Sequence, residues 1–286
     1  MQCRSGDAPA AAQEALRDTL RKQGYFLACQ CPATDELDIV QPGEGALFSP
    51  ATVREKQLLA ANVCRLRLES ATALYYHAGQ FINVRRADGL TRSYSLASLP
   101  QTDEYLELHI RRRPNGAMCN WMFDLLAVGE QVAIQGPIGS CYYLNDRPDT
   151  PLLLIATGTG LAPLLGIARD ALHAGHRGPI HLYHGSSESE GLYCGEELQA
   201  LSDAHSHFAY TRCVSRGAPT VGYESGRADA VAFGRHGNLK GWRIYLCGAP
   251  PMVHAAKKWA YLAGAAIADI YADAFETREL RAQPRD

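Results

Sequence analysis

The sequence predicts an antiparallel β barrel followed by an α/β domain with a parallel sheet. Short strands that alternate polar and apolar residues fill residues 45–147, a pattern typical of a closed barrel. From Thr150 onward apolar strands alternate with helical patterns, which predicts a parallel sheet with crossover helices. Within that part, Leu152–Gly166 joins a buried strand, a glycine turn and a helix. We therefore expect domains at 45–147 and 148–286, preceded by a separate segment at 1–44.

Composition narrows the class of protein. The 286 residues are 47% hydrophobic and 20% charged, which is ordinary for a globular protein of two domains. A net charge of −2 argues against general binding to nucleic acid or to a membrane surface, and no apolar run is long enough for a membrane helix. Nine irregularly spaced cysteines without a signal peptide predict reduced thiols, so we expect a cytoplasmic protein.

The first 45 residues predict a small segment with its own elements. Ala12, Leu16, Thr19 and Leu20 have helical spacing, and Gly24 is expected to end that helix. The alternation in 37–40 predicts a short strand, and Gln41–Gly45 is expected to be a linker. Between them lies the stretch Gly-Tyr-Phe-Leu-Ala-Cys, which ends at Cys29 and is followed by Cys31.

This stretch resembles the last third of a plant-type [2Fe–2S] ferredoxin domain, with Cys29 at the position of the fourth cluster ligand. Such a cluster needs four thiolates, and the two upstream cysteines are absent, so no complete metal site is expected in this chain. Either about 50 residues of a fused ferredoxin module precede this start, or the module has become a structural appendage. Without a cluster, Cys29 and Cys31 are expected to be buried thiols that pack as small hydrophobes.

Three motifs distinguish the barrel. In the strand Arg92-Ser93-Tyr94-Ser95, alternation places Arg92 and Tyr94 on one face, where a guanidinium and an aromatic ring suit a flat ligand with a phosphate. In 109–120 a strand end precedes a glycine turn and a helix expected at Asn120–Ala127, which makes a phosphate cradle. The third motif is Gly-Pro-Ile-Gly at 136–139. Taken singly, Tyr94 is a core aromatic and 111–113 a solvated strand edge.

The α/β part begins with the strand at 152–155 and a helix from Leu161. A glycine turn before a helix gathers unpaired N–H groups at one point, and Gly158 and Gly160 allow a pyrophosphate to approach. Pro163 replaces the third glycine of the ordinary dinucleotide fingerprint. Further strands are expected at 180–185, 208–215 and from Arg243, with helices near 196–201 and up to about 264. Ligands of such sheets bind beyond the carboxyl ends of the strands.

In this order the motifs resemble the ferredoxin–NAD(P)+ reductase family from about residue 45 to the end of the chain. The resemblance implies an FAD-binding barrel and an NAD(P)-binding α/β domain. It assigns Arg92 to the FAD phosphate, Tyr94 to ring stacking and Ser95 to the surroundings of flavin N5. It also implies that the remaining FAD contacts come from His109, Ile110, Arg111, Gly116, Met118 and Cys119, where Cys119 replaces a serine or threonine with a weaker donor.

For the nucleotide, the resemblance implies two turns. The first would hold the pyrophosphate with Thr157, Gly158, Thr159, Gly160 and Pro163. The second would lie beside the nicotinamide with Cys247, Gly248, Pro250 and Met252, although Ala249 stands where proline is common. Phe275 is either the aromatic that shields the flavin or a core residue. Ser95, Cys247 and Phe275 are therefore the candidate catalytic residues.

The choice of nucleotide rests on two loops. Glu188 would accept the adenine ribose hydroxyls and repel a 2′-phosphate, which favours NADH. Arg216, next to Ser215, would bind that phosphate and keeps NADPH open.

The predicted function is a flavin-dependent oxidoreductase. Hydride passes from NAD(P)H to FAD, and single electrons then pass to an iron–sulfur centre or redox partner, as in the reductases of oxygenases. The expected acceptor is a ferredoxin or an oxygenase component, with a [2Fe–2S] cluster only in a longer parent protein. We expect reduction of artificial acceptors and poor transfer to a physiological partner. The alternatives are a stand-alone flavin or ferric reductase with diffusible acceptors, and a non-catalytic FAD-binding redox sensor.

Overall fold

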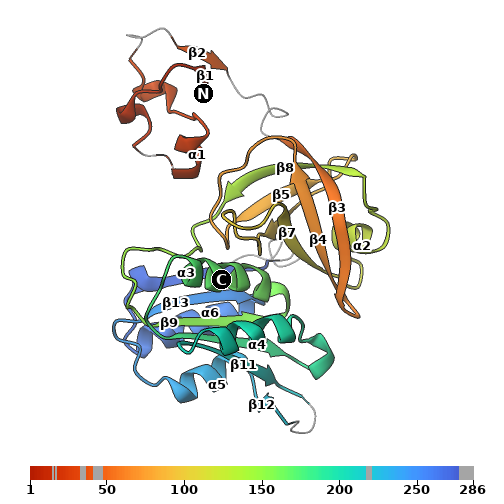
Figure 1. Cartoon of the computed structure of the whole chain (residues 1–286), viewed down its shortest axis with the longest axis vertical. Helices are drawn as coiled ribbons and strands as arrows, with labels where there is room; N and C mark the ends of the chain where they lie inside the picture. Colours follow the sequence, from red (N-terminus) through yellow and green to blue (C-terminus); the bar gives the residue numbers. More distant parts are fainter. Residues whose placement is uncertain (15, 17, 33–36, 41–47, 217–220, 277–286) are drawn as a thin grey trace, which may run out of the picture.

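Three parts follow one another along the longest axis of the computed structural model (Figure 1). An N-terminal segment lies at one end, an antiparallel sheet lies in the middle, and a parallel sheet with its helices lies at the other end. The structure describes residues 1–14, 16, 18–32, 37–40, 48–216 and 221–276.

The N-terminal segment is held together by a two-stranded antiparallel ladder. Its elements are β1 (Gln2–Ser5), η1 (Ala10–Ala12), α1 (Asp18–Lys22), η2 (Ala28–Gln30) and β2 (Asp38–Val40), with β1 paired to β2. The expected strand near 37–40 is therefore confirmed. The expectation of one helix that includes Ala12 is wrong, because Ala12 belongs to a separate 3-10 turn. Only Ala12 and Phe26 of the segment's described apolar side chains are buried, so little packing supports a longer helix. The linker expected at 41–45 lies outside the described residues.

The barrel is a six-stranded antiparallel sheet that closes on itself. Its strands are β3 (Ser49–Ala60), β4 (Val63–Ser70), β5 (Phe81–Arg85), β6 (Thr91–Ser95), β7 (Leu106–Arg111) and β8 (Gln131–Ile138), in the order β6-β5-β8-β3-β4-β7. A bridge between Leu96 and Leu108, and an N–H bond from Ala97 to the Glu107 carbonyl oxygen (2.9 Å), join the first strand to the last. Apolar side chains from alternate positions fill the interior, as period-two strands require.

The helix of this domain starts earlier than expected. Helix α2 covers Ala117–Asp124, whereas the sequence predicted Asn120–Ala127. Because Gly116 ends the turn after β7, the helix begins at once, and Met118 and Met122 then lie one turn apart and pack into the barrel core.

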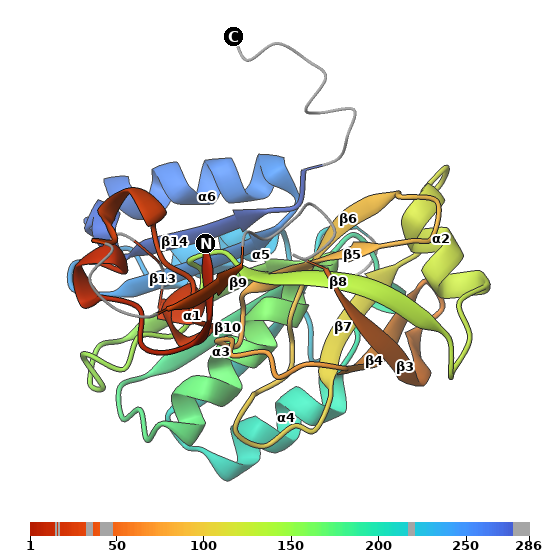
Figure 2. The same ribbon diagram turned by 90° about the horizontal axis from the view of Figure 1, so that it is seen from above.

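The α/β domain is a parallel sheet between two layers of helices. The strands are β9 (Leu152–Thr157), β10 (Ile180–Ser186), β11 (Phe208–Val214), β12 (Glu224–Ser225), β13 (Arg243–Gly248) and β14 (Ile270–Ala274), in the order β12-β11-β10-β9-β13-β14. The helices are α3 (Leu161–His173), α4 (Gly195–Ala204), α5 (Ala228–Arg235) and α6 (Pro250–Leu262), with short η3 (Gly158–Gly160), η4 (Ser189–Gly191) and η5 (Ile267–Asp269). Figure 2 shows α3 and α4 on one side of the sheet and α6 on the other. The strands expected at 152–155, 180–185 and 208–215 and the helix from Leu161 are confirmed.

The strand order identifies where a ligand binds. The chain moves from β9 to β10, β11 and β12 on one side, and then crosses back to β13 and β14 on the other. The carboxyl ends of β9 and β13 therefore lie where the order reverses, which is the binding position in open parallel sheets. α3 and α6, the longest helices that the structure describes, have thirteen residues each, too few to span a bilayer.

Close packing joins the barrel to the α/β domain. A Cβ atom built on Gly79 would lie 2.6 Å from the Cys141 carbonyl oxygen, and one on Gly166 would lie 3.0 Å from the Ala97 carbonyl oxygen. These glycines let α3 approach the barrel backbone. One apolar core contains α3 together with Val63 of β4 and Tyr143 of the connection, so the two domains share buried surface.

Candidate active site

The turn after β9 is held by backbone packing. Gly158 has a φ of +54°, which favours glycine, and Gly160 begins α3 without a side chain to cap it. A Cβ atom on Gly160 would lie 2.2 Å from the Cys247 carbonyl oxygen, so the turn contacts the end of β13 directly. The positive end of α3 therefore opens toward the carboxyl edge of the sheet, where it can attract an anion.

The turn after β13 is joined to both of its neighbours. The Ala249 N–H donates to Thr157 Oγ1 (3.0 Å), and the Phe275 N–H donates to the Gly248 carbonyl oxygen (2.8 Å). A Cβ atom on Gly248 would lie 2.4 Å from Thr157 Oγ1. The ends of β9, β13 and β14 thus meet at one place.

The barrel reaches the same place through Ser95, the last residue of β6. Its hydroxyl donates to Asp273 Oδ2 (3.0 Å), and Asp273 pairs with Cys247 in the register between β13 and β14. Burial raises the pKa of Asp273, and the bond from Ser95 lowers it in part. Ser95, Cys247 and Phe275 are therefore brought together, although they lie far apart in the sequence.

Cys247 lies in an apolar environment at this meeting point. Its side chain is fully buried, and its Sγ lies 3.8 Å from Cys141 Sγ. Burial raises the pKa of the Cys247 thiol well above its usual range. The thiol stays protonated at neutral pH, so it suits positioning rather than nucleophilic attack.

The turn after β7 forms a second, more open cradle. Gly116 begins α2 and has no side chain to cap the helix. The Arg113 N–H donates to Asn120 Oδ1 (3.0 Å), and Asn120 Nδ2 donates to the Arg113 carbonyl oxygen (2.8 Å), which closes the turn. A Cβ atom on Gly116 would lie 2.3 Å from Cys119 Sγ, so a side chain would fill the cradle.

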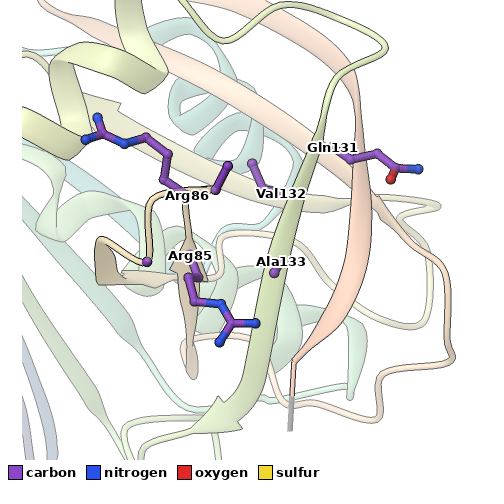
Figure 3. A pocket seen from close by; sticks show the side chains of 7 residues that line it. Arg85, Arg86, Gln131, Val132 and Ala133 are labelled. Atoms are coloured by element: carbon purple, nitrogen blue, oxygen red, sulfur yellow. The ribbon is translucent and has the colours of Figure 1, made fainter. Parts of the chain in front are cut away.

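A separate hollow of about 400 Å³ lies on the barrel between β5 and β8 (Figure 3). The Arg85 and Arg86 side chains point in different directions there. The Arg85 guanidinium lies 3.9 Å above the centre of the Phe48 ring, and that of Arg86 pairs with Asp88. The hollow is lined by residues of β5, β8 and the turn after β5, so it is separate from the place where the ends of β9, β13 and β14 meet.

Comparison with known proteins identifies the two domains. Residues 50–143 match the oxidoreductase FAD-binding domain family, and residues 154–258 match the oxidoreductase NAD-binding domain family. The chain is 36% identical over 268 residues to the ferredoxin–NAD(P)+ reductase component of the naphthalene 1,2-dioxygenase/salicylate 5-hydroxylase systems of Ralstonia, covering 92% of this chain and 81% of that protein. The chain belongs to the ferredoxin–NAD(P)+ reductase family.

Solved structures agree with this placement. The Amycolatopsis cytochrome P450 reductase GcoB is 32% identical, with a TM-score of 0.75 over 96% of this chain and 86% of that chain. The fold is also that of the ferredoxin NADP+ reductase from Neisseria gonorrhoeae with bound FAD and NADP, at 21% identity and a TM-score of 0.70 over 81% and 100% of the two chains. This reductase is therefore an NAD(P)H-dependent, FAD-containing oxidoreductase of the kind that serves oxygenase systems, as the sequence predicted.

The residues present fit both cofactors of the family. FAD would meet Arg92, whose guanidinium is exposed, Tyr94, which is half-buried against the barrel core, and the uncapped start of α2. The Arg111 guanidinium lies beside Gly158, because a Cβ atom there would be 2.9 Å from Arg111 Nη1. Glycine cradles and guanidinium groups are donors suited to pyrophosphates.

Some predicted site residues turn their side chains elsewhere. Ile110 and Met118 are buried in the barrel core, and Met252 is buried between the sheet and α6, so these three can offer only backbone atoms to a cofactor. The Thr157 hydroxyl is committed to the Ala249 N–H. His109 is buried and contacts Glu107 and Tyr193.

The other predicted residues lie at the edges of the site. Thr159 lies within η3, Pro163 within the first turn of α3, and Pro250 at the start of α6. Glu188 and Arg216 are exposed on neighbouring loops, since the Arg216 N–H donates to the Ser187 carbonyl oxygen (2.9 Å). The roles given to all these side chains stay predictions.

The interpretation of the N-terminal cysteines needs a correction. Cys29 is exposed and Cys31 is half-buried, so the expectation that both are buried thiols is wrong. Cys29 lies in the three-residue η2, and few buried side chains surround it. No group of three or more His, Cys, Asp or Glu within the described ranges is placed to hold a metal ion.

Sequence reasoning missed Asp273 and Tyr193. Asp273 is the one acidic residue in β14, Ile-Tyr-Ala-Asp-Ala, and a carboxylate in a short strand that is apolar apart from one phenol was the available signal. Tyr193 stands in an irregular stretch between η4 and α4, where no period or motif marked it.

Proposed function

We propose that this reductase takes electrons from NADH and passes them singly to an oxygenase component or to a ferredoxin. The observation that carries the proposal is the contact between Ser95 of the barrel and Asp273 of the α/β domain, beside Cys247. Because of this contact, the end of β6, which carries residues expected to bind FAD, lies beside the end of β13, whose following turn is expected to hold the nicotinamide. The relative from Ralstonia, a reductase component of oxygenase systems, supports an acceptor of that class.

The chain's own residues would supply position and polarity. FAD, when bound, would supply the chemistry that accepts a hydride and releases electrons one at a time. Arg92 and the start of α2 would bind its phosphates, and the η3–α3 turn would bind the nucleotide pyrophosphate. The Ser95 hydroxyl, oriented by Asp273, would lie next to the flavin edge, and the neutral Cys247 thiol would exclude water from the nicotinamide.

We assign the preference for NADH to Glu188, which lies two residues after the end of β10 and directly before η4. A carboxylate there would accept ribose hydroxyls and repel a 2′-phosphate. Arg216 lies on the adjacent loop, so Glu188→Gln should raise kcat/KM for NADPH more than for NADH. An unchanged ratio would assign the preference to another residue.

The test is the visible spectrum of the purified, FAD-loaded chain before and after anaerobic NADH, together with iron analysis. We expect flavin bands that NADH bleaches, followed by rapid re-oxidation on addition of an artificial one-electron acceptor and slower re-oxidation on addition of a [2Fe–2S] ferredoxin. Failure of NADH to bleach bound FAD would favour the redox sensor. Saturable reduction of free flavin, without transfer to a ferredoxin or an oxygenase component, would favour the stand-alone reductase.

A further inference from the structure

A chain of buried polar side chains crosses from the barrel to the turn after β9. His109 of β7 forms two bonds, from Nε2 to Glu107 Oε1 (3.0 Å) and from Nδ1 to the Tyr193 hydroxyl (3.1 Å). The Tyr193 ring packs edge-on against the His184 ring, with centroids 5.4 Å apart. His184 Nε2 lies 3.1 Å from the Gly158 carbonyl oxygen.

The acceptors at the two ends of this series, the Gly158 carbonyl oxygen and the Glu107 carboxylate, determine which histidine nitrogens donate to them. Burial lowers the pKa of His184 to about 4, so the ring is neutral, and its Nε2–H must donate because a carbonyl oxygen only accepts. At the other end, burial alone would raise the pKa of Glu107, but the bond from His109 and the guanidinium groups of Arg65 and Arg67 lower it to about 2. His109 therefore donates from Nε2 to the Glu107 carboxylate, and its Nδ1 is hydrogen-bonded to the Tyr193 hydroxyl.

The four side chains that link the barrel to the Gly158 turn are almost completely buried. His184 is 0% exposed, Tyr193 3%, and His109 and Glu107 5% each. Hydrogen bonds in such surroundings are not exchanged for water, so each one constrains geometry. The pair of Arg169 with Asp103, by contrast, joins the two domains without ending on a cofactor turn.

This series of buried polar side chains ends at the Gly158 peptide, in the turn expected to bind the nucleotide. Gly158 lies at the switch point of the sheet, with a φ of +54°. The strand that carries His109 also carries Arg111, whose guanidinium lies beside Gly158. His109 of β7 is linked to the Gly158 peptide through Tyr193 and His184, and Arg111 of β7 lies directly beside that peptide.

We propose that Tyr193 and His184 are positioning residues that hold the turn at 158–160 in register with β7, and thereby align the nicotinamide with the flavin. The inference rests on the proposed function, because the alignment matters only if both nucleotides bind there. Tyr193 of the α/β domain acts through its bond to His109 of the barrel, and His184 acts by fixing the orientation of the Gly158 peptide. Misalignment of reacting groups by a fraction of an ångström costs rate more than it costs binding.

The experiment compares three variants that each remove the polar contacts of one buried side chain and keep a ring. Tyr193→Phe removes the bond to His109, and His184→Phe removes the bond to Gly158. Tyr143→Phe is the matched control, because Tyr143 is also buried, lies 3.1 Å from His176 Nδ1, and meets that ring edge-on. His176 follows the end of α3 and Gly158 precedes its start, so this variant reports the loss of a buried tyrosine hydroxyl that bonds to His176 and to Asn145 Oδ1 (3.5 Å) away from the Gly158 turn.

Two readouts separate positioning from stability. In the FAD-loaded protein without NADH, amide hydrogen exchange of the peptide that contains 157–161 should become about tenfold faster in Tyr193→Phe and His184→Phe, and stay unchanged in Tyr143→Phe. With saturating NADH, the rate of flavin bleaching should fall about tenfold in Tyr193→Phe. In His184→Phe, the rate of flavin bleaching should fall too, and the KM for NADH should rise about fivefold.

The control decides the outcome. Equal exchange and bleaching in Tyr193→Phe and Tyr143→Phe would overturn the inference, even if both variants unfold at lower temperature than the wild-type protein. If the wild-type protein itself is not bleached by NADH, the proposed function fails. Unchanged amide exchange at 157–161 in His184→Phe would be enough to show that the bond from His184 does not hold the Gly158 turn.

Discussion

The two glycine turns that precede helices α2 and α3 resemble each other in sequence but differ in what holds them. The turn at Gly116 is closed by Arg113 and Asn120, which lie within a few residues of it. The turn at Gly160 is packed against the backbone of Cys247, 87 residues later in the chain, and its Gly158 carbonyl oxygen is bound by His184. One cradle is therefore local, and the other depends on the assembled sheet and barrel.

This difference predicts how each turn responds to change. A side chain added to the local turn meets the movable Cys119 side chain, whereas one added to the distant turn meets a carbonyl carbon and oxygen of β13. Backbone in a central strand cannot shift without disturbing its ladder. Substitutions in the nucleotide turn should therefore cost more than equivalent ones in the flavin turn.

The largest effect is expected for Gly160→Ala. The new Cβ would lie 2.2 Å from the Cys247 carbonyl oxygen, so the free energy of unfolding should fall by about 3 kcal/mol and NADH should no longer bleach the flavin. Urea unfolding and anaerobic titration measure both. Gly234→Ala in α5, where a Cβ would meet open space, should keep full stability. A fully stable, NADH-responsive Gly160→Ala protein would show that the β13 contact is not rigid.

Next in size is the effect of Glu107→Gln, which breaks the barrel end of the buried polar chain. The pKa of Glu107 is lowered from 4.5 to about 2, so its charge contributes stability above pH 4.5 that is lost as the pH falls toward about 2. The variant should lose about 2 kcal/mol at neutral pH and converge with the wild-type protein near pH 2. Unfolding curves across this range test it. Glu55→Gln, which removes an exposed partner of Arg67, should change stability by less than about 0.5 kcal/mol.

A smaller loss is expected for Thr157→Val. The substitution keeps the shape of the side chain but removes the acceptor of the Ala249 N–H, so stability should fall by about 1 kcal/mol and the KM for NADH should rise. Thermal unfolding and initial rates provide the measurement, with Thr91→Val as the control, at the start of β6, where the hydroxyl donates to the Gly89 carbonyl oxygen (3.1 Å). Identical behaviour of the two variants would mean that the hydroxyl does not fix the β9 and β13 turns to each other.

The smallest effect is expected for Gly116→Ala. The added Cβ meets Cys119 Sγ, which can rotate away, so stability should fall by only about 0.5 kcal/mol while FAD binds more weakly. Fluorescence of released FAD measures the affinity, and the double variant with Cys119→Ser should recover it. If Gly116→Ala destabilised the protein as much as Gly160→Ala does, the distinction between a local and a long-range turn would be wrong.

Local pattern was enough to determine the order of the elements and the places where turns meet helices. Apolar runs such as 152–155, the glycines after them and the arginine–tyrosine pair of β6 act over a few residues, so periodicity and turn chemistry reveal them. The barrel and the parallel sheet followed from that information, and the order of the motifs carried the resemblance to the family. The N-terminal helix was mispredicted because its residues have the right spacing but almost no core to pack against.

The tertiary structure alone decided which side chains meet. The Ser95–Asp273 bond joins residues 178 apart, and the direction of the His109 side chain depends on Glu107 and Tyr193. Ile110, Met118 and Met252 face cores rather than a cofactor, although they lie within cofactor motifs. The physical reason is that a motif specifies the backbone near a ligand, whereas the partner of each side chain is set by packing between segments that the sequence keeps far apart.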